Sequence, residues 1–127
     1  MVEPSSLRRV ARLSVPRRLS DPGLEIRLVR LVDLSLEGAR IEHQEPLNEK
    51  LACFIDLPPD LGRVRLTGRI VWTKLQKAEQ TLEGERHVYY HSGLTWTTLT
   101  PEQQRALAVA LEKLQAEIDP PAAGPSS

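Results

Sequence analysis

Cysteine, aromatic residues and net charge are the features that this 127-residue sequence has little of. Its single cysteine means that no disulfide can form within the chain. Aromatic residues make up only 4% of it, which leaves few flat rings on which nucleic-acid bases could stack. Lysine plus arginine and aspartate plus glutamate are equal at 17 each, so the overall charge does not draw the protein to nucleic acid or anionic lipid.

Long apolar segments are also missing. No segment approaches the roughly 18 apolar residues that a membrane-spanning helix needs. Residues 1–18 lack the apolar core of a secretion signal. We therefore expect a cytoplasmic protein without membrane insertion. Cys53 lies in the apolar segment 51–55, which indicates a buried and inert thiol.

The chain reads as a single globular domain of short strands. Hydrophobic residues at 40% and charged residues at 27% are typical of folded proteins. Turns rich in glycine and proline separate apolar segments, which favours a small β-barrel or sandwich. We interpret the charged segment 74–86 as a long hairpin loop. The expected strands cover 26–34, 39–43, 51–57, 64–73 and 87–97, with a further extended segment at 12–19.

Near the end of the sequence, the spacing of the apolar residues becomes that of a helix. Thr100-Pro101-Glu102-Gln103 is a capping box with proline at the first helical position, so a helix begins there. Its leucines and isoleucine at 107, 111, 114 and 118 form one apolar stripe, which must pack on the strands. Residues 119–127 are rich in proline, alanine and serine and predict a disordered tail. Residues 1–7 predict a flexible N-terminus.

Catalytic and metal-binding patterns find no support in the sequence. His87 and His91 share one face of a strand, but no cysteine or third histidine completes a metal site with them. No nucleophile elbow, phosphate-binding glycine loop or zinc-protease helix occurs. We therefore expect a protein that is not an enzyme and that carries no metal and no cofactor.

Arginines gather near the start of the chain. Arg8, Arg9 and Arg12 lie in an arm without acidic residues, and Arg8 and Arg12 form an R-x-x-x-R pattern. Guanidinium groups donate paired hydrogen bonds to phosphate oxygens and to the acceptor edge of guanine. The same pattern at Arg65 and Arg69 lies in a regular strand, where two solvated arginines on its outer face are the preferred interpretation.

A second pattern, D-x-S-x-x-G, ends the expected strand 26–34. In an extended chain Asp33 and Ser35 project to the same face. A carboxylate accepts hydrogen bonds from the N1–H and N2–H₂ groups of guanine, and Gly38 lets a ligand approach closely. The alternative is an ordinary turn, in which Asp33 and Ser35 bond to local backbone.

The arginine pattern and the D-x-S-x-x-G pattern are more informative together than separately. Roughly 20 residues separate Arg12 from Asp33, enough for a strand, a turn and a second strand that returns antiparallel. The arginine arm would then fold back across Asp33, Ser35 and Gly38. Cationic groups and acidic acceptors would share one cleft, which suits a ligand with both phosphates and a guanine edge.

These residues make the sequence similar to the PilZ domain family. Arg8 and Arg12 followed by Asp33-Leu34-Ser35-Leu36-Glu37-Gly38 resemble its two signature motifs. The resemblance continues in Leu57-Pro58, in 68–72 and in 92–96, and covers about residues 8–116. It implies an all-β fold, a six-stranded antiparallel β-barrel with one C-terminal α-helix, over residues 8–118. It also implies binding of the bacterial second messenger cyclic di-GMP.

By position in those motifs, Arg8 and Arg12 would hold guanine and phosphate, and Asp33, Ser35 and Gly38 would form the barrel side of the site. Arg9 lies inside the first motif and would add a phosphate contact. We expect one ligand per domain, because a stacked pair brings more phosphate charge to neutralise.

The sequence is compatible with three functions. In the first, cyclic di-GMP orders the arginine arm and creates a surface for a partner protein, so the chain is a ligand-gated effector. In the second, the same fold is an adaptor between proteins that works without ligand. The third, nucleic-acid binding by the arm, is disfavoured by zero net charge and few aromatics. The intact motifs favour the first, with an unidentified protein partner.

Overall fold

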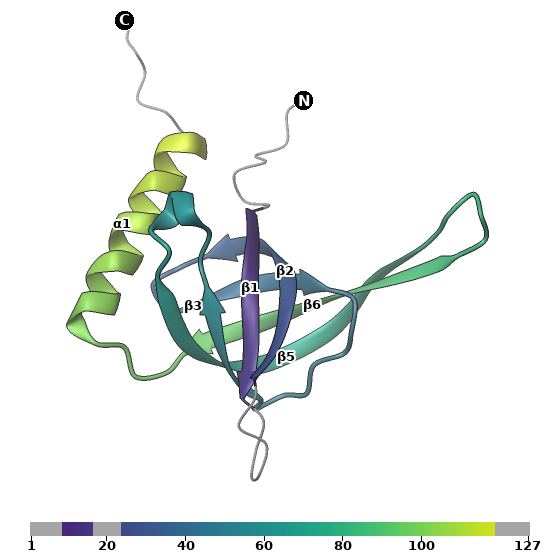
Figure 1. Ribbon diagram of the computed structural model, residues 1–127, viewed down its shortest axis with the longest axis horizontal. Helices are drawn as coiled ribbons and strands as arrows, with labels where there is room; N and C mark the ends of the chain where they lie inside the picture. The colour runs from purple at the N-terminus through teal and green to yellow at the C-terminus, as the bar shows by residue number, and fades with distance from the viewer. Residues whose placement is uncertain (1–8, 17–23, 119–127) are drawn as a thin grey trace, which may run out of the picture.

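Six antiparallel strands and one helix make up the protein. The computed structural model describes residues 9–16 and 24–118 (Figure 1). The predictions for the flexible segment 1–7, for Arg8 and for the tail 119–127 lie outside these residues. The elements are β1 (Arg9–Pro16), β2 (Leu24–Leu34), β3 (Gly38–His43), β4 (Ala52–Asp56), the 3₁₀ turn η2 (Pro59–Leu61), β5 (Arg65–Gln80), β6 (Arg86–Trp96) and α1 (Pro101–Ile118).

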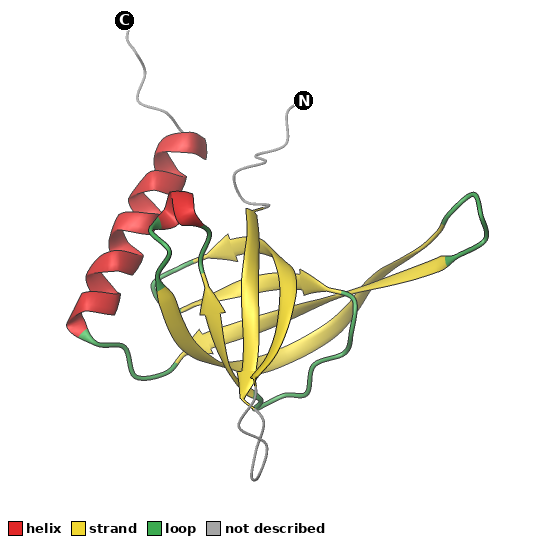
Figure 2. Ribbon diagram, in the orientation of Figure 1, coloured by secondary structure: helices red, strands yellow, loops and turns green. Residues whose placement is uncertain are grey.

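The strands close into a ring in the order β1-β2-β3-β6-β5-β4. Every neighbouring pair is antiparallel, and β4 completes the ring by pairing with β1. Figure 2 shows how the strands wrap around one interior. Closure leaves the ring without a free edge strand. The prediction of six antiparallel strands followed by one C-terminal helix is confirmed.

Alternating side chains fill the interior of the ring. Apolar residues at every second strand position point inward, as the two-residue period of a strand requires. Cys53 is one of them, so the burial that the sequence predicts for it is confirmed, and this burial raises the pKa of its thiol to about 12. The side chains with 1% exposure or less on the strands include Leu13, Leu31, Ile41, Ile55, Leu66 and Ile70.

Helix α1 packs against the same interior. Leu107, Ala110 and Leu114 are buried in one cluster with the strand residues. Burying each of these leucines contributes about 1.5–3 kcal/mol. The capping box is present: the Thr100 hydroxyl accepts from the Gln103 backbone N–H at 3.0 Å, and the Gln103 side chain accepts from the Thr100 N–H at 2.8 Å. The helix lies beside η2 (Figure 1).

The charged segment 74–86 is not a loop, so that prediction is wrong. Strands β5 and β6 remain paired as far as Gln80 and Arg86, and the loop between them covers only 81–85. The paired strands project from the ring as a long arm (Figure 1). On β5 both faces of this arm are exposed, as for Leu75, Gln76 and Lys77. Because neither face is buried there, the sequence has no apolar alternation to mark a strand.

Candidate functional site

The arginines of β1 point in two directions. Arg12 is exposed, while its neighbours Ala11 and Leu13 are buried, so Arg12 lies on the outer face of the ring. Among the described residues, its guanidinium has no hydrogen-bond or ion-pair partner. Arg9 is three positions earlier and therefore on the opposite side of the strand.

Arg9 is held by acidic groups from distant parts of the chain. Its guanidinium forms ion pairs with Asp60 of η2 and with Glu117 of α1. Only 16% of the Arg9 side chain is exposed. Arg9 thus ties β1 to the turn and to the helix, and its pairs engage both terminal nitrogens of the guanidinium, Nη1 and Nη2.

A β-bulge gives Asp33 its direction. In the pairing of β2 with β3, Leu31 is opposite Ile41 and Asp33 is opposite Arg40. Between these two pairs β2 advances by two residues and β3 by only one, so β2 contains one extra residue. Leu31 is buried, and uninterrupted alternation would turn Asp33 inward as well. The bulge reverses the alternation, and the Asp33 carboxylate instead lies outside, 3.1 Å from the Arg40 guanidinium. The sequence pattern had no signal for this extra residue.

Ser35 shapes the turn between β2 and β3. Its hydroxyl oxygen accepts hydrogen bonds from the backbone N–H groups of Glu37 and Gly38, each at 3.1 Å. Its own N–H donates to the Gly38 carbonyl at 2.8 Å. The Trp96 indole N–H donates to the Ser35 carbonyl at 3.1 Å. These bonds are those of an ordinary turn, and they fix the position of the residues that follow Asp33.

Gly38 is required by the packing of two strands. A Cβ atom at this position would lie 1.8 Å from the Leu94 carbonyl oxygen of β6. Gly38 is also buried, so its missing side chain lets β3 approach β6 rather than opening a space for solvent. The motif glycine therefore has a structural role that needs no ligand.

Arg12 and Asp33 share the outer face of two neighbouring strands. Arg12 is opposite Leu28 in the antiparallel register of β1 and β2. Asp33 is five positions further along β2, roughly 17 Å at about 3.4 Å per residue. The β2–β3 turn with Ser35 lies at the same end of the ring as the start of β1. The structure thus places Arg12 and Asp33 on one outer face, with Asp33 and this turn further along β2 toward its end, whereas Arg9 points to α1.

A hollow of about 540 Å³ opens beside Arg12. It lies on the outer face between β1 and β4 and reaches the connection from β4 to β5. Asp56 is opposite Arg12 in the register of β1 and β4. No sequence pattern indicates this hollow, because its lining residues come from three separate segments that only the folded chain brings together. Its lining residues are Val10, Ala11, Arg12, Leu28, Asp56, Leu57, Pro58, Pro59, Arg63 and Arg65.

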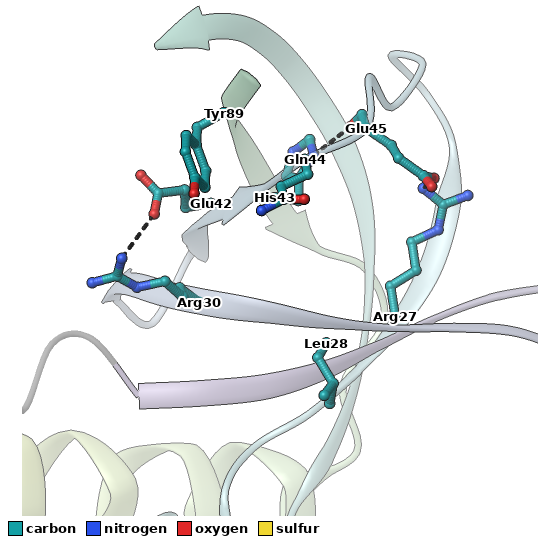
Figure 3. Close-up of a pocket in the computed structure, with 8 residues that line it drawn as sticks. All are labelled: Arg27, Leu28, Arg30, Glu42, His43, Gln44, Glu45 and Tyr89. Carbon is teal, nitrogen blue, oxygen red and sulfur yellow. Dashed lines mark hydrogen bonds and ion pairs between the residues drawn. The ribbon is translucent and has the colours of Figure 1, made fainter. Parts of the chain in front are cut away.

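Figure 3 shows a smaller hollow of about 230 Å³ over β2 and β3. Its two arginines are each paired with a carboxylate: Arg30 donates to Glu42 at 3.2 Å, and Arg27 forms an ion pair with Glu45. Its acidic and basic groups therefore balance. An anionic ligand would find little uncompensated positive charge in this hollow.

His43 lies at the border of that hollow and is buried. Its Nδ1 lies against the Glu45 carbonyl, and its Nε2 is 2.7 Å from the Ser92 hydroxyl. A neutral ring satisfies both contacts by donating from Nδ1 and accepting at Nε2. Burial lowers the pKa of His43 below its usual 6.5, against a smaller opposite effect of the Glu45 carbonyl. His43 is thus a structural residue at neutral pH.

His87 and His91 both have acidic neighbours. His91 Nε2 is 3.1 Å from Glu42, and His87 Nε2 is 3.6 Å from Glu85. Within residues 9–16 and 24–118, no group of three or more His, Cys, Asp or Glu side chains is arranged to hold a metal ion. In the same part of the chain, no helix has the length and apolar character to cross a membrane.

A comparison with models of protein families agrees with the motifs and the ring of strands described above. The family model described as PilZ domain matches residues 6–113. The chain belongs to the PilZ domain family. The matched segment includes both motifs, all six strands and most of α1. No curated protein matches this PilZ domain significantly.

Solved structures show the same fold. The PilZ domain of YcgR from Escherichia coli, solved with c-di-GMP, is 16% identical, has a TM-score of 0.61, and aligns over 85% of this chain and 83% of its own. Apo MrkH from K. pneumonia is 16% identical with a TM-score of 0.60, over 86% of this chain and 48% of its own. The chain thus spans about half the length of MrkH. Identities this low establish the fold alone.

Proposed function

We propose that this PilZ domain binds cyclic di-GMP on the outer face of β1 and β2, through Arg12 and Asp33 together with Arg8. One observation carries the proposal: Arg12 faces outward on β1, the strand that pairs with the Asp33 strand β2. Arg12 is exposed and has no partner among the described residues. A free guanidinium forms strong paired bonds with phosphate. An outward carboxylate can accept the two donors of a guanine edge.

Asp33 would have to exchange one partner for another. Its carboxylate is paired with Arg40 in the absence of ligand, at a site where both side chains are about half exposed. Exposed ion pairs contribute only about 0–1 kcal/mol, so a guanine edge can compete with Arg40. Ser35 contributes by holding the turn, and its hydroxyl is already bonded to Glu37 and Gly38.

The ion pairs of Arg9 oppose its binding to a phosphate. To contact phosphate it must leave Asp60 and Glu117, which releases two carboxylates at η2 and α1. We propose that Arg8 and Arg12 make the main contacts and that Arg9 joins only if those pairs break. Glu37 is exposed at the β2–β3 turn and adds one negative charge near the site.

The function that follows is that of a ligand-gated effector. YcgR was solved with c-di-GMP, and MrkH is described as a transcription regulatory factor that depends on it. For this chain we propose that the bound nucleotide orders the arginine arm and so creates a surface for a protein partner. We propose no catalytic step, and a cytoplasmic location stays a prediction from the sequence.

The alternative function is an adaptor of the same fold that works without ligand. One observation favours it: Ser35 and Gly38 have complete structural roles of their own, so an intact D-x-S-x-x-G motif would persist without nucleotide. A partner that binds equally well with and without cyclic di-GMP would support the adaptor.

Isothermal titration calorimetry with cyclic di-GMP tests the proposal. We expect the wild-type chain to bind and Arg12→Ala to bind about ten- to hundredfold more weakly, because a charge-assisted hydrogen bond is lost. Arg69→Ala is the matched control, since Arg69 is also an exposed strand arginine, and within the described part of the chain it bonds to the Lys50 carbonyl and to no other group. Absence of wild-type binding, or equal affinities of all three proteins, would refute nucleotide recognition by this site.

A further inference from the structure

We propose that Arg63 is a further ligand-binding residue, which together with Arg12 holds a phosphate of the bound nucleotide in the hollow between β1 and β4. The inference rests on the proposed function and extends it to a residue outside both motifs. Arg63 comes from the connection between η2 and β5, and Arg12 from β1. Both line the hollow of about 540 Å³.

The charge of the hollow is positive. Among the described residues, three arginines and one carboxylate line it, Arg12, Arg63 and Arg65 with Asp56, which leaves an excess of two positive charges. By comparison, the arginines of the hollow in Figure 3 are matched by acidic residues. A concave surface with uncompensated positive charge attracts anionic ligands.

Arg65 already has a partner, so the excess charge belongs to the other two arginines. Its guanidinium donates two bonds to Asp56, at 2.7 and 3.0 Å, and these bonds raise the pKa of Arg65. It also lies over the Phe54 ring, 5.4 Å from the ring centre. Asp56 is thereby neutralised, although it is opposite Arg12 in the strand register.

Arg63 has no such partner. Within the described part of the chain, no hydrogen bond or ion pair involves its guanidinium, and the residue is exposed. Two unpaired guanidinium groups that border one hollow are suited to binding a phosphate from two sides.

The backbone places Arg63 in a fixed and unusual conformation. Its φ is 53°, in the left-handed region that few residues other than glycine adopt, and it follows Gly62 with φ 101°. The Arg63 N–H donates to the Pro58 carbonyl at 3.3 Å, and Leu57 N–H donates to Val64 at 2.9 Å. This tight turn fixes where the arginine leaves the backbone, so less freedom is lost when it binds a ligand.

The walls of the hollow suit a nucleotide as well. Val10 and Leu28 are 55% and 73% exposed, although both are large apolar residues on paired strands. Pro58 and Pro59 add apolar surface on the other side. A purine or ribose that covers these side chains would remove apolar area from water while its phosphate meets the arginines.

Arg63→Asn is the variant that tests the assignment, with Arg86→Asn as its control. Asparagine removes the charge and tolerates the left-handed conformation. Arg86 is an exposed arginine on the projecting β5–β6 arm, outside the hollow. In calorimetry with cyclic di-GMP, we expect Arg63→Asn to weaken binding about ten- to hundredfold and Arg86→Asn to change it less than twofold.

Arg63→Lys separates charge from structure. Lysine keeps the cation but not the planar pair of donors, so we expect its affinity to lie between those of wild type and Arg63→Asn. Melting temperatures of all variants report whether the turn is intact. If wild type binds, Arg12→Ala loses affinity and Arg63→Asn binds like wild type, the Arg63 assignment is refuted while the proposed function stands. A wild-type chain that binds no cyclic di-GMP would refute both.

Discussion

Replacing Gly38 by alanine tests whether the motif glycine is structural. The new Cβ would lie 1.8 Å from the Leu94 carbonyl oxygen, whereas real Cβ atoms essentially never approach within 3.0 Å of another atom. Strand β3 or β6 must therefore move by at least about 1.2 Å, the difference between these two distances. The obstacle is backbone, which cannot rotate away, and Gly38 is paired with Thr95 in the ladder.

We expect a large loss of stability. Overpacking a core typically costs about 1–3 kcal/mol, and a clash with backbone lies at or above the upper end. For a chain of this size, about 3 kcal/mol corresponds to a melting temperature lower by roughly 12 °C. The assay is a thermal unfolding curve followed by circular dichroism.

Gly84→Ala provides the comparison. Gly84 has φ 90°, but nothing lies within 4 Å of the position of its Cβ. Alanine there meets only the conformational penalty of about 1–2 kcal/mol. If Gly38→Ala melts at the same temperature as Gly84→Ala, the structural role of Gly38 in the close approach of β3 and β6 is refuted.

Three further outcomes follow from named contacts. Burial lowers the pKa of His43 in the folded state. Its contribution to stability is therefore complete above pH 6.5 and is lost as the pH falls below that value. Urea unfolding between pH 8 and pH 5 should show a smaller pH dependence for His43→Gln than for wild type. Thr100→Ala removes the hydroxyl that caps α1 and should cost about 1 kcal/mol in the same assay, and an unchanged stability would contradict the capping box. Arg9→Ala removes the pairs with Asp60 and Glu117 and should expose the α1 amides to faster hydrogen exchange, while exchange in β6 stays constant.

Much of the fold could be predicted from local patterns in the sequence. The capping box and the leucine stripe predicted α1, and the apolar residues at Leu66 and Ile70 helped to predict β5. Both predictions succeed because each of these elements buries one face, which leaves a periodic pattern in the sequence. The projecting part of β5 and β6 could not be predicted in this way. It is exposed on both faces along β5, so its strand conformation depends on pairing between residues that are distant in sequence.

The candidate site was less accessible to sequence reasoning. The pattern identified Arg12 and Asp33, but only the bulge in β2 explains why Asp33 points outward. The pair of Arg9 with Glu117 joins residues 108 positions apart, and no local signal indicates it. Arg63 belongs to no motif, and only the folded chain brings it to the same hollow as Arg12.

The most direct test of the nucleotide-binding account is a crystal structure of this chain grown with cyclic di-GMP. We expect a ligand phosphate within hydrogen-bonding distance of the Arg12 guanidinium and a guanine edge on the Asp33 carboxylate, which would then have exchanged Arg40 for the base. A ligand bound elsewhere on the chain, with Asp33 still paired to Arg40 and Arg12 in solvent, would contradict the account.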